Sequence, residues 1–227
     1  MKNIAENIPT LTQKIREYED LYKRPSGSVS LLAVSKKQTQ DKIRQAAAVG
    51  IRSFGENYLQ EALHKIKSLT DMDLSWHFLG SIQTNKTRKI AEYFDWVQSV
   101  DREKIAYRLS SQRPESSPPL NVCVQIKLSN EEKKSGAEVE HATKLCSLIA
   151  SLPNLQLRGL MAIPAPLPDL ESQRTCFRRL KLAFTNLKKS HSSIDTLSMG
   201  MSNDFEAAVA EGSTMVRLGS AIFGPRI

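Results

Sequence analysis

The apolar run at residues 29–37 is the sequence feature that most constrains the fold. It reads VSLLAVSKK, a short stretch of Val, Leu and Ala that ends in a serine and two lysines. An apolar run of this length without helical periodicity is typical of a buried strand in a parallel sheet. Lys36 would then lie at the carboxyl end of that strand, where parallel α/β folds place their chemistry.

A lysine in this position has two interpretations. If Lys36 lies against apolar walls, its amine loses hydration and its pKa falls. It then becomes a nucleophile that can form a Schiff base with an aldehyde. In the alternative, Lys36 or Lys37 simply points into solvent where the strand ends. The residues around the run leave both interpretations open.

The pattern of a short apolar strand followed by an amphipathic helix repeats along the chain. The expected strands are 29–36, 51–58, 74–80, 96–100, 121–128, 155–163, 195–199 and 215–219. The expected helices are 3–23, 39–49, a segment through 62–69, 84–93, a segment through 105–109 that Asp101 would cap, 139–152, 170–190 and 204–211. Eight strands separated by seven helices, with one more helix in front, predict an α/β fold, a (β/α)8 TIM barrel with an extra N-terminal helix.

Two features bear on the domain organisation. An open doubly wound sheet would need fewer strands and a Gly-rich fingerprint, yet neither GxGxxG nor GxxxxGK[ST] occurs. The segment 113–119, RPESSPP, has the composition of a linker, but the strand and helix pattern resumes after it. We therefore expect a single domain over residues 1–227, in which the N-terminal helix completes the outer layer that the end at Ile227 omits.

Composition narrows the functional class. The formal net charge is +8, but the basic residues alternate with acids and form no dense run with aromatics, which disfavours a nucleic-acid partner and suits anionic metabolites. No apolar stretch approaches the roughly 20 residues of a membrane helix, and the polar start at residues 1–3 has no hydrophobic region behind it, so we expect a cytoplasmic protein. Separately, we expect a monomer. Three widely spaced cysteines indicate reduced, buried thiols and no metal site.

The barrel brings distant residues to one rim. Lys36, Asn57, His77 and the segments 199–203 and 217–224 would all lie at carboxyl ends of strands. In both segments glycine and small hydroxyl residues come just before a helix, which is typical of a phosphate site. Arg217 shares a strand face with Gly219, and its buried charge would need an acceptor, either the ring nitrogen of a phosphorylated aldehyde cofactor or a neighbouring carboxylate.

An amine, a phosphate site and an arginine together predict pyridoxal 5'-phosphate as the cofactor. Arginine does not give up its proton, so the ring nitrogen of the cofactor would stay unprotonated and the cofactor would be a weak electron sink. Three roles stay open. His77 is a core histidine or a functional one, Asn57 bonds the ring oxygen or a nearby loop, and Glu56 is a general base only if it points towards the site.

Six motifs carry a resemblance to a known family. They are LAVSK at 32–36, FGENY at 54–58, WHFLGSIQTNK at 76–86, RGLMAIP at 158–164, LSMGMS at 197–202 and VRLGSAIFG at 216–224. Over the whole chain, and in this order, they closely resemble the pyridoxal phosphate homeostasis protein family, once labelled proline synthase co-transcribed homologues. Departures such as Leu79 and Ser81 are conservative.

The resemblance implies a barrel like the N-terminal domain of alanine racemase. Lys36 matches the lysine that carries pyridoxal phosphate. Ser202, Gly219, Ser220 and Gly224 would lie near the phosphate, with Arg217 at the ring nitrogen. With Asn57 and His77, these are the expected cofactor-binding residues, and no catalytic residue is established.

The resemblance also implies a carrier or regulator of vitamin B6 and amino-acid pools without established catalytic turnover, with apoenzymes that use pyridoxal phosphate as partners. A two-base racemase needs a second proton donor on the opposite face of the substrate, which alanine racemases take from an added domain, and this chain has no residues left to build one. A weak amino-acid racemase or lyase, with Lys36 as the base, is the alternative. A nucleic-acid-associated module is the third hypothesis.

Overall fold

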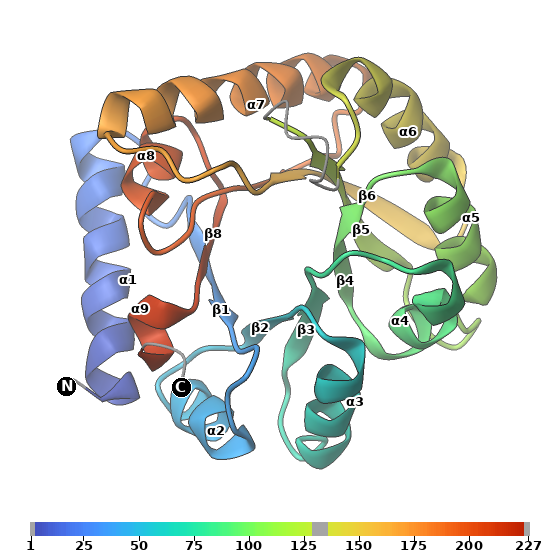
Figure 1. Cartoon of the computed structure of the whole chain (residues 1–227), viewed down its shortest axis with the longest axis horizontal. Helices are drawn as coiled ribbons and strands as arrows, with labels where there is room; N and C mark the ends of the chain where they lie inside the picture. The colour runs from blue at the N-terminus through green and yellow to red at the C-terminus, as the bar shows by residue number, and fades with distance from the viewer. Residues whose placement is uncertain (1–2, 129–135, 225–227) are drawn as a thin grey trace.

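The structure, a computed structural model, describes residues 3–128 and 136–224, and its strands close into a parallel barrel (Figure 1). The strands follow one another in chain order, and the last pairs with the first. They are β1(Ser30–Val34), β2(Ser53–Glu56), β3(Ser75–Phe78), β4(Trp96–Val100), β5(Leu120–Ile126), β6(Leu155–Ala162), β7(Thr196–Ser198) and β8(Met215–Leu218). The (β/α)8 prediction is therefore confirmed.

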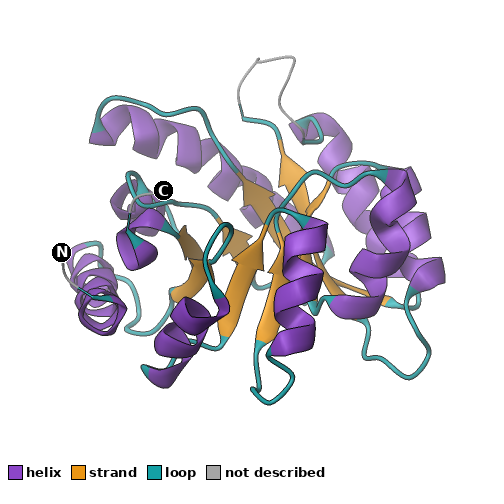
Figure 2. Cartoon of the chain, turned by 60° about the horizontal axis from the view of Figure 1, so that its bottom comes forward, coloured by secondary structure: helices purple, strands orange, loops and turns teal. Residues whose placement is uncertain are grey.

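The helices alternate with the strands and surround the barrel (Figure 2). They are α1(Ile4–Leu21), α2(Gln40–Ala48), α3(Leu59–Ser68), α4(Thr87–Tyr93), α5(Glu103–Gln112), α6(Val139–Ser151), α7(Leu170–Ser190), α8(Phe205–Ala210) and α9(Ser220–Phe223), with a short 3-10 helix η1(Thr84–Lys86) before α4. The predicted extra N-terminal helix is α1. It packs against α2, α8 and α9, at the left of Figure 1.

The N-cap residue of α2 agrees with the sequence prediction, whereas that of α5 differs from it. Thr39 caps α2, as predicted, by accepting from the Lys42 amide. Asp101 does not cap α5, because the N-cap residue with extended backbone is Arg102, one position later. The Asp101 carboxylate instead accepts from Nη1 of Arg102 at 2.6 Å. An aspartate one residue too early cannot reach the free amides of the first turn.

Apolar side chains fill two separate regions. Most lie between the strands and the helices, where the buried faces of the helices cover the outside of the barrel. A small cluster of Leu32, Leu79 and Met215, with Val34 against it, fills part of the interior. Polar side chains, among them His77 and Gln98, are also buried on the inward faces of the strands. The barrel is thus a packed core and not a pore.

The linker-like segment 113–119 is tied to the barrel. Arg113 is buried and donates to the carbonyl oxygens of Pro118, Ala91 and Phe94 at 2.6 to 2.8 Å. Its side chain thus connects the segment to α4 and to the residues before β4. The sequence also predicts a polar loop through residues 134–136, of which residues 134 and 135 lie outside the described residues.

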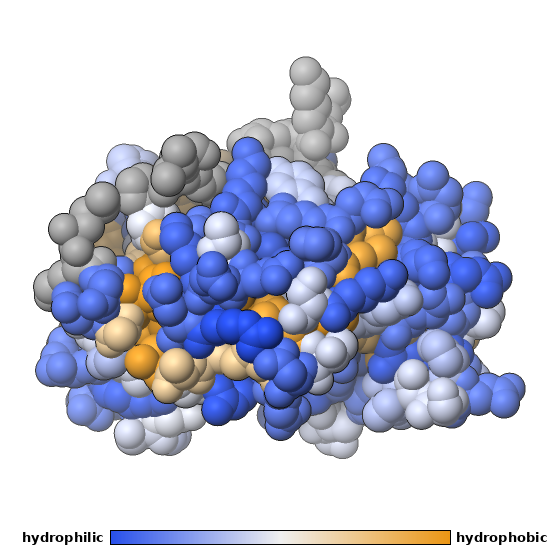
Figure 3. Space-filling view, turned by 90° about the horizontal axis from the view of Figure 1, so that it is seen from below, coloured by the Kyte–Doolittle hydropathy of each residue, from blue (hydrophilic) through white to orange (hydrophobic). Residues whose placement is uncertain are grey.

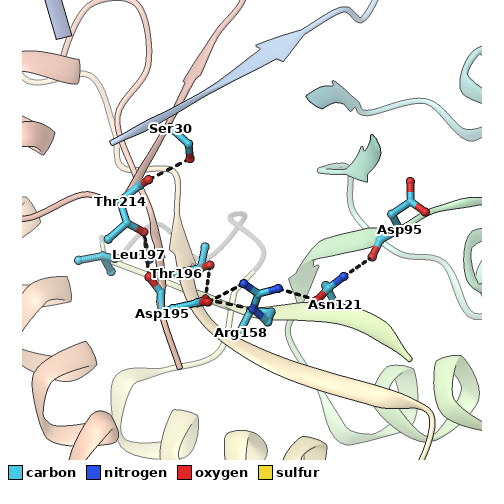
Figure 4. Close-up of polar contacts among 8 residues, drawn as sticks. All are labelled: Ser30, Asp95, Asn121, Arg158, Asp195, Thr196, Leu197 and Thr214. Carbon is cyan, nitrogen blue, oxygen red and sulfur yellow. Dashed lines mark hydrogen bonds and ion pairs between the residues drawn. The ribbon is translucent and has the colours of Figure 1, made fainter. Parts of the chain in front are cut away.

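A polar network joins the amino-terminal parts of six strands, β1 and β4 to β8 (Figure 4). Arg158 of β6 binds the Asp195 carboxylate through Nε at 3.0 Å and Nη2 at 2.5 Å. Its Nη1 donates to Oδ1 of Asn121 at 2.8 Å, and its guanidinium stacks on the Trp96 ring at 4.5 Å. On the other side, Thr214 Oγ1 donates to the Asp195 carbonyl at 3.2 Å. Ser30 Oγ of β1 donates to the carbonyl of the same threonine at 3.0 Å. We call these residues the amino-end clasp.

The face of the molecule in Figure 3 is largely hydrophilic, with hydrophobic residues in several separate areas among the hydrophilic ones. No helix in the described part of the chain is long and apolar enough to cross a membrane. The cysteines carry free thiols, of which Cys123 and Cys146 are buried, as expected, while Cys176 is only half-buried. Burial raises the pKa of the Cys146 thiol to about 12, so it is protonated and inert at neutral pH.

Candidate functional site

A cavity of about 310 Å³ opens where the carboxyl ends of the strands meet. Its walls come from β1, β8 and the segments that follow β1, β2, β3, β6, β7 and β8, with one residue each from α7 and α9. The lining residues are Val34, Lys36, Asn57, Leu79, Ile163, Pro166, Leu167, Gln173, Met201, Ser202, Asn203, Asp204, Arg217, Gly219 and Ser220. This is the end at which barrels of this kind carry their sites.

Most of the site residues that the sequence predicts line this cavity. Its walls include Lys36, Asn57, Ser202, Arg217, Gly219 and Ser220. His77 and Gly224 are not among the lining residues. Gly224 lies just after α9 with a φ of +87°, and its amide donates to the Ser220 carbonyl, so it ends that helix.

Lys36 lies in the tight turn between β1 and α2. Its side chain is half-buried and reaches the cavity wall. The preceding Ser35 is buried, and its amide continues the ladder of β1 by donating to the Gly55 carbonyl at 3.0 Å. The following Lys37 has a φ of +60° and turns the chain towards α2. The lysine is therefore held between a strand end and a sharp turn.

Arg217 provides a buried cation in the wall. It is 3% exposed, and it donates from Nη1 to Ser198 Oγ and from Nη2 to the Ala162 carbonyl, both at 2.7 Å. Burial lowers its pKa to about 10, partly offset by the Asp204 carboxylate, so it stays charged at neutral pH. A guanidinium has further N–H groups beyond these two, which a ligand acceptor in the cavity can use.

Two hydroxyl groups and a close backbone approach form another part of the wall. Ser220 Oγ lies 3.2 Å from Ser202 Oγ, and the Ala221 amide donates to the same Ser202 oxygen at 3.4 Å. A Cβ on Gly219 would lie 3.1 Å from the Val34 carbonyl oxygen. Only a residue without a side chain thus leaves this corner open, next to two hydroxyl donors that suit an anionic group.

Asp204 is a cavity residue that sequence analysis did not identify. Its Oδ1 accepts from the Met201 amide at 2.5 Å, which folds the loop after β7 back on itself. Burial raises the pKa of this carboxyl group, while the Met201 amide and Arg217 act in the opposite direction. Its position just before α8 was visible in the sequence, but not the direction of its side chain.

His77 lies deeper in the barrel. One ring nitrogen, Nδ1, is 2.9 Å from Nε2 of Gln98, whose Oε1 accepts from Ser198 Oγ at 2.6 Å. Ser198 in turn accepts from Arg217. The ring stacks on Trp96 with centroids 5.0 Å apart. Burial, with a smaller effect of Arg158, lowers the pKa of His77 to about 3, so the ring is neutral at physiological pH. His77 thus reaches the cavity wall only through other side chains.

Glu56 does not face the cavity either. It is fully buried beside Lys65, whose Nζ lies 2.7 Å from Oε1 of the glutamate, and Ser35 Oγ donates to that same oxygen at 2.6 Å. Burial raises the pKa of Glu56, and the ammonium group of Lys65 opposes this. Sequence analysis missed Lys65, because one of the two lysines in a helix gives no signal of burial.

The lining residues after β6 were also missed. Ile163, Pro166 and Leu167 follow that strand, and Gln173 reaches over from α7. The only sequence signal was the Pro-Ala-Pro run that ends the strand. Apolar residues in an irregular loop have no periodicity from which their direction could be predicted.

Comparisons with known proteins place the chain among others with the same architecture. The family model described as alanine racemase, N-terminal domain, matches residues 7–226. A protein of Pseudomonas aeruginosa called pyridoxal phosphate homeostasis protein is 53% identical, covering 100% of this chain and 97% of its own length. One of Escherichia coli K12 with the same name is 47% identical, covering 100% and 98%.

A solved structure agrees with these relatives. PipY of Synechococcus elongatus, in its form with PLP bound, is 38% identical and superposes with a TM-score of 0.84, covering 98% of this chain and 100% of PipY. The likeness thus extends over the barrel and the rim that carries the cavity.

Proposed function

Because this chain belongs to the pyridoxal phosphate homeostasis protein family, within the larger family of the alanine racemase N-terminal domain, we propose that it binds pyridoxal 5'-phosphate in the cavity at the carboxyl rim. It holds the cofactor on Lys36 and takes part in the homeostasis of vitamin B6 and amino acids. The observation that supports this most directly is the convergence of an amine, two hydroxyls and a buried guanidinium on one cavity of about 310 Å³.

The residues fit this cofactor on chemical grounds. Ser202 and Ser220, with the open corner at Gly219, suit the phosphate. Arg217 suits an acceptor on the ring, and because it stays charged it can only donate to that atom. Asn57 supplies an amide in the wall beside Lys36. Pyridoxal phosphate, when bound, offers an aldehyde with which a lysine amine can form a Schiff base.

The protein acts without catalytic turnover. Among the described residues of the cavity wall, the titratable groups are Lys36, Asp204 and Arg217. Asp204 is engaged by the Met201 amide and Arg217 does not release a proton at neutral pH, so neither suits a second acid–base group that acts with Lys36. The whole chain serves as one binding domain.

The cofactor is passed on to apoenzymes that use it, and the chain works as a monomer. Its exposed large hydrophobic residues, in the part that the structure describes, are Leu21, Tyr58, Tyr107, Leu170 and Leu182. Leu170 and Leu182 both belong to α7 but are twelve positions apart, and the other three belong to α1, to the residue before α3 and to α5. These five residues are therefore not the continuous apolar face that a stable dimer buries.

The first test is to locate the attachment. Purified protein is incubated with pyridoxal phosphate, reduced with borohydride and digested, and the peptides are analysed by mass spectrometry. We expect the reduced adduct on Lys36, and we expect Lys36→Ala to lose it. The control is Lys37→Arg, which keeps the charge of the neighbouring exposed lysine but cannot form a stable adduct. An adduct that persists in Lys36→Ala would contradict the proposal.

A second test addresses turnover. Amino acids are incubated with the loaded protein in deuterated water, and exchange at the α-carbon is followed by NMR. We expect no exchange above that of free pyridoxal phosphate at the same concentration. Exchange well above that level, absent in Lys36→Ala, would instead establish the weak racemase or lyase.

A further inference from the structure

A buried group of charged residues lies directly behind the turn that carries Lys36. Lys65 of α3 contacts two carboxylates, Glu56 Oε1 at 2.7 Å and Glu61 Oε1 at 2.5 Å. The side chains of Lys65 and Glu56 are 4% and 0% exposed, and that of Glu61 is 27% exposed. We call these three residues, none of which lines the cavity, the anchor cluster.

The anchor cluster holds the backbone on both sides of Lys36. Before it, Lys65 Nζ donates to the Ser35 carbonyl at 2.7 Å, and Ser35 Oγ donates to Glu56 Oε1 at 2.6 Å. After it, the Lys37 amide donates to Glu61 Oε1 at 2.5 Å. The residues before and after Lys36 are therefore each bound to the cluster.

The turn needs such support. Lys37 has a φ of +60°, in the left-handed region that lysine rarely adopts. Backbone in this region persists only where its surroundings fix it. Here Lys37 is fixed through its amide, and the local bond from the Gln38 amide to the Ser35 carbonyl closes the turn around Lys36.

The cost of the cluster also points to a role. Burying a lysine and a glutamate removes both from water, and apolar residues of the same size often stabilise a fold equally well. Moreover, Oε2 of Glu56 is buried without a hydrogen-bond partner in the described structure. Unlike apolar residues, these charged residues form hydrogen bonds with the backbone and the Ser35 side chain of the turn.

We propose that Glu56, Lys65 and Glu61 are positioning residues that fix the Ser35–Lys37 turn and thereby aim the Lys36 amine into the cofactor cavity. The inference rests on the proposed function, since it assigns to Lys36 the role of cofactor attachment. The anchor cluster acts through the backbone and does not touch the cofactor.

The decisive variant is Glu61→Gln. When Glu61 is replaced, the buried Lys65 keeps Glu56 as its partner, so the substitution leaves no buried charge unpaired. It does weaken the hydrogen bond to the Lys37 amide. Glu56→Gln is the second variant and weakens the hold on Ser35. The matched control is Glu19→Gln. Glu19 is a fully buried carboxylate that accepts from the amides of Gly27 and Val29, which directly precede the amino end of β1.

Two measurements are made on the full-length protein. In the absence of cofactor, hydrogen exchange of peptides covering residues 35–38 reports on the turn. With pyridoxal phosphate added, borohydride trapping on Lys36 over a range of concentrations reports on the amine. For Glu61→Gln we expect at least tenfold faster exchange in the turn and at least tenfold weaker trapping. For Glu19→Gln we expect both to stay as in the wild type, although its stability falls.

The outcomes separate this proposal from the proposed function. If the turn exchanges at the wild-type rate in Glu61→Gln, or if trapping falls as far in Glu19→Gln, the positioning role is wrong. If the wild type itself traps no cofactor on Lys36, the proposed function fails, whatever the exchange measurement shows. The variants Glu56→Asp and Glu61→Asp keep a carboxylate at each position. If they trap pyridoxal phosphate with the wild-type affinity, the positioning role of the carboxylates is supported further.

Discussion

His77 shows how burial decides the chemistry of a single residue. In the sequence it stands between two aromatic residues, which left a core role and a functional role open. In the structure its ring is enclosed, stacked on Trp96 and bonded to Gln98, and its pKa is lowered to about 3. It is therefore a neutral hydrogen-bonding group over the physiological pH range, and its relation to the cavity is indirect.

A pH-dependent stability follows. An unfolded chain binds a proton at His77 below about pH 6.5, whereas the folded chain does so only near pH 3, so stability is lost as the pH falls between these values. Between pH 7 and pH 5 the wild type should lose about 2 kcal/mol more than His77→Gln, which lacks this group. Urea unfolding at both pH values measures the difference. If the two proteins lose stability in parallel, His77 titrates normally in the fold.

Lys36, Arg217 and Gly219 could be predicted from the sequence because strand ends in a closed parallel barrel converge, and because residues two apart share a strand face. All three line the cavity. Glu56 and Lys65 could not be assigned in this way. Both are common surface residues, and their burial depends on a contact between a strand and the next helix that no local pattern reveals.

At the scale of elements, the alternation of strands and helices was predictable, while their ends were less so. The predicted helix 84–93 is divided into η1 and α4, and the predicted strand 51–58 is only four residues long as β2. Helix and strand ends depend on which backbone amides find partners, and several residue types can serve there. The assignment of Asp101 as a cap failed for this reason.

The two aspartates at helix starts provide a matched comparison. Asp169 caps α7, accepting from the Ser172 amide at 2.8 Å and from its hydroxyl at 2.7 Å, whereas Asp101 caps no helix. Asp169→Ala should lower the free energy of unfolding by about 1 kcal/mol, and Asp101→Ala by about half of that or less. Thermal and urea unfolding of both variants measure this. Equal losses would show that the capping bond adds nothing at Asp169.

At the scale of the whole molecule, the two ends of the barrel have different tasks. The carboxyl rim carries the cavity, and the amino ends carry the amino-end clasp around Arg158 and Asp195 (Figure 4). Nothing in the sequence marks the clasp, since its members are single residues before, at the start of or, for Arg158, within separate strands. Only the closed barrel brings them together.

This division predicts opposite effects for two substitutions. Arg158→Met removes the ion pair with Asp195, the bond to Asn121 and the stacking on Trp96, so it should cost about 1–2 kcal/mol of stability while pyridoxal phosphate still attaches to Lys36. Lys36→Ala should leave stability unchanged and abolish the attachment of pyridoxal phosphate. Urea unfolding and borohydride trapping of both variants test this. A loss of trapping in Arg158→Met with the fold intact would show that the amino end takes part in binding.

The amino-end clasp bears on how a ligand enters and leaves the cavity. In the part of the chain that the structure describes, Leu32, Leu79 and Met215 fill part of the barrel interior, the clasp joins the amino ends of the strands, and the cavity lies at the carboxyl rim. Under the proposed function, pyridoxal phosphate enters and leaves the cavity at this rim. An apoenzyme that takes up the cofactor there would cover the rim while it is bound, so the cavity could be refilled only after that enzyme has dissociated.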